Sequence, residues 1–508
     1  MEMKKLAIRG VAFSWVGRIC SFAITFVVTP IVVHGLGKEG YGLWAIVMSM
    51  TGYYMLADLG LRSATVKYVS QFAAVDDWES ANKAVATSLA VYLLLAIVVC
   101  LLAGCVAAVF PLIFATGQQD ANTIRWVVLL TGVTVSVRIL GQTSGAVLTA
   151  LKRFDLAQGL AISALILQAA LIVLVLRRGH GLLAMALVTL VVAILCELCR
   201  YALAMRVARH LSLSPRSYER KMLKVLFRFG GLNVIQGAAT RIANSAGAII
   251  IGIILGPASV AFYAIAESLV RKGIHFSKGV GGVLMPVASH LDAQQRGEDL
   301  VRAFLLVSRS LLALALGLVT ILIVLGHSFV DLWIGPDYST HTYPLLCLLA
   351  LTMIVRMPSN CARSILVGMN RMGFLVKVAL VETVGIVGLG VVLTMTNGPV
   401  GMACAVLLTQ CITAGILIPA FACRSLNVPA AEYVRKTCVP AVIAAFPGLV
   451  VGTALVQMSP PTHLIHVIAW ALCIILTVGI TAFFICLERQ TRMDMLRSFQ
   501  RTRQSSSG

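Results

Sequence analysis

The stretch TVSVRILGQTSGAVLTALKR, residues 134–153, recurs in altered form as TMIVRMPSNCARSILVGMNR, residues 352–371. Most aligned positions keep their polar or apolar character. The identical pairs are Thr134 and Thr352, Val137 and Val355, Arg138 and Arg356, Leu148 and Leu366, and Arg153 and Arg371. The match indicates that this chain contains an internal repeat.

A second pair of segments supports the repeat at nearly the same offset. LGKEGYGLWAI, residues 36–46, aligns with LGPASVAFYAI, residues 255–265. In each case the segment joins the first two apolar stretches of its half. We therefore expect two copies of a six-helix unit, an N-terminal lobe at residues 1–210 and a C-terminal lobe at residues 222–424.

The composition places these copies in a membrane. The chain has 508 residues, of which 59% are hydrophobic and only 12% charged, and its mean hydropathy is +0.93. Apolar runs of about 20 residues are long enough to cross the hydrocarbon core, and backbone groups in lipid must pair within helices. The sequence predicts an all-α membrane protein with about 14 spans, near residues 9–35, 42–64, 84–110, 126–150, 156–176, 182–205, 226–254, 258–284, 304–328, 343–368, 374–395, 400–423, 438–458 and 464–487.

The basic residues predict the orientation of these spans. Most of the 41 Lys and Arg fall in segments on the side of the two termini. Lys38, Arg125, Arg177 and Arg178 fall on the opposite side. Loops rich in Lys and Arg stay in the cytoplasm, so both termini are expected there. The net charge of +21 is spread over short loops, which argues against a nucleic-acid partner.

Arg138 and Arg356 lie within predicted spans, where an arginine at the centre costs about 2.5–3.5 kcal/mol and normally faces protein or water. A repeat of six helices gives two halves with the same orientation, and substrate sites in such transporters lie between the halves. The two arginines are therefore expected to face a shared cavity. An amide follows each arginine by one turn, at Gln142 and Asn360.

The first helices of the two halves carry polar residues at helical spacing, including Arg18 in one and Arg241 and Asn244 in the other. These residues are expected to line the same cavity. The alternative interpretation is that small polar residues join helices by hydrogen bonds.

Three intramembrane carboxylates have an arginine one turn away, which predicts structural ion pairs. The pairs are Asp58 with Arg62, Glu197 with Arg200, and Glu267 with Arg271. No acid lies three or four residues from the remaining arginines, which are Arg18, Arg138, Arg241, Arg309 and Arg356. This surplus favours an anionic ligand with phosphate or carboxylate groups, which arginine binds through a planar fork.

Glu382 is the fourth intramembrane carboxylate, and no basic residue lies one turn from it. A carboxyl group in a low-dielectric site can take up a proton reversibly, so Glu382 is a candidate for ion or proton coupling. A salt bridge to one of the cavity arginines is the alternative.

Three segments resemble a known family: LGKEGYGLWAIVMSM at 36–50, LADLGLRSATVKYVS at 56–70, and DLWIGPDYSTHTYPLLCLLAL at 331–351. They are similar to bacterial polysaccharide exporters, the lipid-linked oligosaccharide flippases of the multidrug/oligosaccharidyl-lipid/polysaccharide exporter superfamily. The resemblance covers nearly the whole chain, although its motifs are loose packing patterns and include no strict arginine motif.

The resemblance implies a flippase that moves a polyprenyl-diphosphate-linked oligosaccharide across the bacterial inner membrane for surface polysaccharide biosynthesis, such as that of lipopolysaccharide or exopolysaccharide. Its two lobes would rock around a central cavity in alternating access. The lipid-linked oligosaccharide, membrane lipids and a polysaccharide polymerase complex are the implied partners. The additional helix pair at 425–487 would form a groove for the lipid tail, followed by a basic cytoplasmic tail at 488–508.

Other functions remain open. A flippase for the peptidoglycan lipid precursor would also have a cationic cavity, whereas a multidrug exporter of the same superfamily would be expected to have an acidic one. A membrane-embedded sugar polymerase or ligase is a different class, but such enzymes usually carry a large outer loop. We therefore expect no enzyme.

No cofactor or metal site is expected. The CxxC formed by Cys196 and Cys199 has no second pair of ligands nearby, and a closed zinc site needs four. A phosphate-binding GxxxxGK[ST] loop is absent from the sequence.

Overall fold

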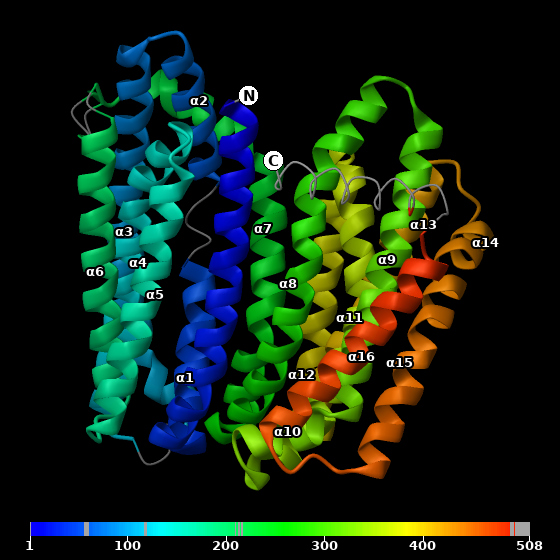
Figure 1. The fold of residues 1–508 in the computed structure, drawn as a ribbon. Coiled ribbons are helices and arrows are strands. Elements are labelled where there is room, and N and C mark those ends of the chain that lie inside the picture. The colour runs from blue at the N-terminus through cyan, green and yellow to red at the C-terminus, as the bar shows by residue number, and fades with distance from the viewer. Residues whose placement is uncertain are drawn as a thin grey trace, which may run out of the picture. The chain divides into compact units, whose positions relative to one another are not determined.

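A computed structural model describes residues 2–54, 60–115, 119–208, 210–211, 214, 217–487 and 492 (Figure 1). Nearly all of this described part is helical, and it divides into two compact units, Met1–Ala261 and Phe262–Gly508. The all-α fold expected from the hydropathy is confirmed.

Unit 1 is built around α4. This helix packs against α3 and α6, while α1 packs against α5 and α7. Its helices are α1 (Glu2–Tyr54), α2 (Leu61–Ala74), α3 (Trp78–Ile113), α4 (Ala121–Ala150), α5 (Phe154–Arg177), α6 (Leu182–Val207) and α7 (Arg220–Leu255). The contacts assign α7 to unit 1, although the sequence repeat starts its second copy there. A contact boundary does not test a sequence repeat, so the lobes at 1–210 and 222–424 stay a prediction.

Unit 2 is built around α9 and α11, which pack against each other. The terminal helices α15 and α16 pair with one another and both contact α9. The elements are α8 (Pro257–Ala293, whose first turn belongs to unit 1), α9 (Gly297–Val324), α10 (Gly326–Trp333), α11 (Pro336–Gly368), α12 (Met372–Gln410), the π-helix η3 (Cys411–Leu417), α13 (Ile418–Ser425), α14 (Ala430–Tyr433), the π-helix η4 (Val434–Cys438), α15 (Val439–Met458) and α16 (Leu464–Ile485).

The described residues include eleven helical segments that are long and apolar enough to cross a membrane. The segment Met372–Ser425 has 54 residues and contains two of the predicted spans. It breaks at Gly398, where φ is 63°, and α1 breaks in the same way at Gly37, where φ is 67°. Only glycine adopts such backbone angles routinely. The protein is therefore a multi-pass membrane protein, while the count of fourteen spans stays a prediction.

Local sequence sets where α3 and α4 begin. The Asp77 carboxylate accepts the Ser80 backbone N–H at 3.0 Å, and Asp120 accepts that of Thr123 at 3.2 Å. Each aspartate thereby satisfies a donor that a helix start leaves unpaired. The bond from Ser80 also lowers the pKa of the Asp77 carboxyl.

Small residues let α3 and α4 approach closely, as is typical of helices packed in membranes. A Cβ on Gly132 would lie 2.1 Å from the Ala103 Cβ. Outward faces carry exposed apolar side chains such as Leu101 on α3 and Val392 on α12, which suits contact with lipid tails. The close packing holds α4, and with it Arg138, in a fixed position within unit 1.

We predict that Gly132→Ala lowers the thermal unfolding midpoint of the purified protein in detergent. The added methyl group forces the two helices apart, and such overpacking typically costs about 1–3 kcal/mol. Gly104→Ala is the matched control, because Gly104 lies on α3 with no atom near its added Cβ. Equal midpoints for the two variants would contradict this account of the helix contact.

Candidate functional site

Glu197 and Arg200 form an ion pair inside unit 1. Both lie on α6, one turn apart, and Arg200 Nη1 donates to the two carboxylate oxygens of Glu197 at 2.7 Å each. Their side chains are only 12% and 18% exposed. The pairing expected from the spacing is therefore present.

Helix α4 leaves room for this pair. A Cβ on Gly141 would lie 1.6 Å from Oε2 of Glu197, and Gly145 faces the Arg200 side chain. The absence of side chains at these two positions lets α6 bring Glu197 directly against α4. The two glycines of the GQTSG segment thus serve the packing of a charged group.

Helix α2 joins the same network through Arg62, whose Nη1 donates to Gln142 Oε1 on α4 at 3.2 Å. Gln142 is therefore engaged by an arginine of its own unit. Asp58, the expected partner of Arg62, lies outside the described residues.

Arg138 lies one turn before Gln142, and its side chain is exposed at the surface of unit 1. It interacts electrostatically with Glu197, but no carboxylate lies within 4 Å of it among the described residues. Three guanidinium groups, those of Arg62, Arg138 and Arg200, thus surround the one described carboxylate of this cluster. Among the described residues, this cluster therefore has more guanidinium groups than carboxylates.

Glu382 forms a second ion pair of low exposure, in unit 2. Its Oε2 accepts a bond from Arg363 Nη2 at 3.2 Å, and its Oε1 accepts one from Gln410 Nε2 at 2.7 Å. The side chain of Glu382 is 9% exposed and that of Arg363 is 22% exposed. The acid without a partner on its own helix is thus paired across helices, with an arginine that is not among those expected to line the cavity.

Arg356 lies on α11 near this pair. Its strongest favourable electrostatic interaction is with Glu382, and Glu267 contributes a weaker one. Glu267 itself forms an ion pair with Arg271 on α8, as the spacing predicts. No carboxylate lies within 4 Å of the Arg356 guanidinium in the described part of unit 2. Arg356 and Arg138 therefore share the same situation, each beside an acid already bonded to another arginine.

The other predicted site residues are distributed more widely. Asn360 Nδ2 donates to Ser277 Oγ at 2.7 Å, a contact between α11 and α8 that is typical of packed membrane helices. Arg241 is exposed on α7 and Asn244 is partly buried there. Arg309 lies on α9 in a cavity separate from the Glu382 pair. The side chain of Arg18 lies outside the described residues, as do the tail residues 488–491 and 493–508.

The sequence did not predict the bonds that Arg363 and Gln410 make with Glu382. Arg363 has no acid one turn away on its own helix, and its guanidinium bonds to Glu382 on the next helix. Gln410 is 2% exposed and immediately precedes η3. A single amide side chain within an apolar span could have indicated that Gln410 has a polar partner. The π-helix that follows it is also notable, because π-helical turns occur frequently at functional sites.

The geometry of the described arginines suits binding of an anion. A guanidinium that keeps donors unused by a carboxylate can bind phosphate through two parallel bonds. Arg138 and Arg356 meet this condition within their own units.

Comparison with known proteins identifies the family and the fold of the chain. The pattern of a family described as "Polysaccharide biosynthesis protein" matches residues 7–292, which is more than half of the chain. The chain belongs to this family.

One relative of this chain is a Shigella flexneri protein named "Putative O-antigen transporter". The two are 22% identical over 333 residues, and the match covers 63% of this chain and 75% of the relative. Among solved structures, an inward-facing multidrug resistance MATE family transporter matches with a TM-score of 0.70 and 17% identity, covering 81% of this chain and 98% of that one. The lipid II flippase MurJ in an inward closed conformation matches with a TM-score of 0.68 and 13% identity, covering 94% and 98%. The chain therefore has the fold of these transporters.

We predict that Glu197→Gln destabilises the protein more than Arg200→Gln does. Removing the carboxylate leaves three guanidinium groups without a described counter-charge, whereas removing Arg200 leaves Glu197 compensated by Arg62 and Arg138. Breaking a buried ion pair costs about 3–5 kcal/mol, so Glu197→Gln is expected in this range and Arg200→Gln below it. Thermal unfolding in detergent measures both, and a larger loss for Arg200→Gln would refute the shared-acid arrangement.

Proposed function

We propose that the protein is a flippase that moves a polyprenyl-diphosphate-linked oligosaccharide across the bacterial inner membrane, for surface polysaccharide biosynthesis. The family assignment, the O-antigen relative and the transporter fold support this proposal. A diphosphate head group carries several negative charges and is costly to bring into lipid. It needs a cationic, hydrated path, while its lipid tail can stay among the bilayer lipids.

The observation that carries the proposal is the excess of guanidinium over carboxylate in both units. Arg138 and Arg356 each lie beside an acid that is already bonded to another arginine. Both can therefore offer donors to a ligand without leaving an unpaired carboxylate behind. We propose that they bind the diphosphate, with Gln142 and Asn360 contributing to the polar surroundings.

Two related functions compete with this one. A multidrug exporter is favoured by the structural match to a MATE transporter, but a surplus of arginine suits few cationic drugs. A peptidoglycan lipid-precursor flippase shares the diphosphate chemistry and has the fold of MurJ. The relative named for O-antigen favours the polysaccharide substrate. In each of these functions the protein transports its substrate and catalyses no covalent step.

The proposal includes the orientation and partners of the chain. Both termini lie in the cytoplasm, on the side rich in Lys and Arg. The two repeat-related lobes alternate between inward and outward access, and a polysaccharide polymerase takes up the exported unit.

Deletion of the gene in its host tests the function as a whole. We expect the lipid-linked oligosaccharide to accumulate on the cytoplasmic leaflet, where a membrane-impermeant label for the sugar cannot reach it in intact spheroplasts. Restoration of labelling by the cloned gene is the control. Unchanged labelling after deletion would show that the chain carries a different cargo.

We predict that Arg138→Gln and Arg356→Gln each slow flipping of a labelled polyprenyl-diphosphate oligosaccharide in proteoliposomes about 10- to 100-fold. This range corresponds to loss of a charge-assisted hydrogen bond of about 1.5–3 kcal/mol, at 1.4 kcal/mol per factor of ten.

Arg125→Gln and Arg371→Gln are matched controls for these variants. Arg125 lies near the start of the helix that carries Arg138 near its middle, and Arg371 lies just beyond the end of the helix that carries Arg356. Both controls should transport normally, and all four variants should keep the parental unfolding midpoint. Normal flipping by both test variants would make Arg138 and Arg356 structural residues.

We propose that Glu382 couples transport to a proton or another cation. Protonation would weaken its bond to Arg363 and free that guanidinium, changing how α11 and α12 are held together. Glu382→Gln is therefore expected to flatten the dependence of flipping rate on pH. Glu432→Gln, at an acid paired with Lys436 near a helix start, should leave the profile unchanged. A parental profile for Glu382→Gln would remove this residue from the coupling step.

A further inference from the structure

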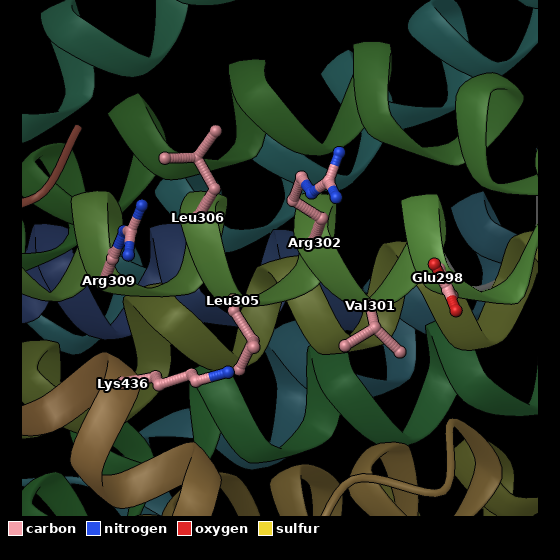
Figure 2. A pocket seen from close by; sticks show the side chains of 7 residues that line it. All are labelled: Glu298, Val301, Arg302, Leu305, Leu306, Arg309 and Lys436. Carbon is pink, nitrogen blue, oxygen red and sulfur yellow. The ribbon is translucent and has the colours of Figure 1, made fainter. Parts of the chain in front are cut away.

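A third group of cations lies apart from the Glu197 and Glu382 pairs. It lines a cavity of about 330 Å³ in unit 2 (Figure 2). Six lining residues come from α9 and one comes from η4, which leads into α15. They are Glu298, Val301, Arg302, Leu305, Leu306, Arg309 and Lys436.

The lining of the cavity consists of three cations, three apolar side chains and one acid, Glu298. Arg302, Leu306 and Arg309 follow one another at spacings of four and three residues, so they share a face of α9. Figure 2 shows the two arginines projecting on the same side of the helix, with Leu306 between them. Lys436 extends from the neighbouring element toward Leu305 (Figure 2).

Nearby acids neutralise only part of the positive charge of Arg302 and Lys436. Lys436 Nζ lies 2.6 Å from Glu432 Oε1, which is a direct salt bridge. Arg302 Nη1 is 3.9 Å from Asp299 Oδ1, beyond hydrogen-bond distance. The other oxygen of Asp299 is already bound by Arg296 at 2.7 Å. The Arg302 fork therefore keeps donors for a ligand.

The length of α9 places the cavity near the membrane surface. Its 28 residues extend for about 42 Å at 1.5 Å per residue, against a hydrocarbon core of about 30 Å. The helix is thus about two turns longer than the core, and the span predicted at residues 304–328 begins just after Arg302, which places this residue toward the head groups. Arg309 begins about 10 Å deeper and can extend along the cavity toward that level.

We propose that this cavity binds the phosphate of an anionic phospholipid from the bilayer. Arg302 and Lys436 would hold the phosphate, Arg309 would add to the positive potential below it, and Val301, Leu305 and Leu306 would contact the glycerol and the start of the acyl chains. Basic pockets between membrane helices bind lipid head groups in this manner. The proposal concerns a lipid of the membrane and does not depend on which substrate the protein transports.

A bound lipid would have a defined mechanical effect. The cavity is bounded by α9 on one side and by Lys436, in the element that leads into α15, on the other. A phosphate bonded to both Arg302 and Lys436 would join the additional helix pair to α9 at one end.

A soluble phosphate is the competing ligand for the same cations. It would make no use of the three apolar side chains, so the apolar lining favours a phosphate that carries a lipid. The experiment must therefore compare phosphatidylglycerol, neutral phosphatidylcholine and soluble glycerol 3-phosphate as probes.

Native mass spectrometry of the full chain in detergent measures lipid binding directly. We expect phosphatidylglycerol to bind at least tenfold more tightly than phosphatidylcholine, and glycerol 3-phosphate not to displace it at equal concentration. The double variant R302Q/K436Q should weaken phosphatidylglycerol binding about 10- to 100-fold. Both residues are largely exposed at their side chains, 67% and 48%, so the variant should fold.

The control is R424Q/R435Q, which removes two equally exposed cations from α13 and η4 without touching the cavity. It should bind phosphatidylglycerol like the parent. Arg302→Lys keeps the positive charge but removes the planar fork of donors, so it should weaken phosphatidylglycerol binding by a smaller factor than the double variant. This single variant tests the site even if the double variant is unstable. Equal losses in test and control, unchanged binding in both test variants, or displacement by glycerol 3-phosphate would each overturn the proposal.

Discussion

A carboxylate inside a membrane protein requires cations close to it, and Glu197 and Glu382 impose this requirement on the two units. Leaving either one unpaired would cost several kcal/mol, so the surrounding helices must bring arginines to it. In unit 1 the cation is Arg200, on the same helix α6 as Glu197, and Gly141 lets α4 pack directly against the pair. In unit 2 the requirement is met across helices, by Arg363 and Gln410.

This requirement alone does not explain how many arginines are present. One cation neutralises one carboxylate, and both acids already have a directly bonded arginine. Arg138 and Arg356 add further charge at a further cost of insertion, and they occupy identical positions in the repeated segment. A cost incurred at matching positions of both copies is difficult to attribute to packing. The proposed diphosphate ligand would compensate this charge while it is bound.

The sequence predicted best those interactions that lie within a single helix. Hydropathy predicts an all-helical membrane fold because each span must satisfy its own backbone, and spacing by one turn predicts the bond between Glu197 and Arg200. Neither rule predicts which side chains on different helices bond to each other. Periodicity along one helix could not choose Arg363 as the partner of Glu382, nor predict that Asn360 bonds to Ser277. Those contacts depend on how α11 packs against α8 and α12, which the residue pattern of any single helix leaves open.

The helix pair outside the repeat shows how the same packing rules extend the fold. Val478 of α16 lies between two glycines, because a Cβ on Gly448 of α15 would meet it at 2.3 Å and one on Gly317 of α9 at 3.2 Å. Gly452 makes a similar close contact with Ile474. Such close approach of backbones gives strong dispersion contact in lipid, where no hydrophobic force drives helices together. The pair is therefore fixed to α9 along its apolar length as well as near the cationic cavity, and any motion of α9 during transport must carry α15 and α16 with it.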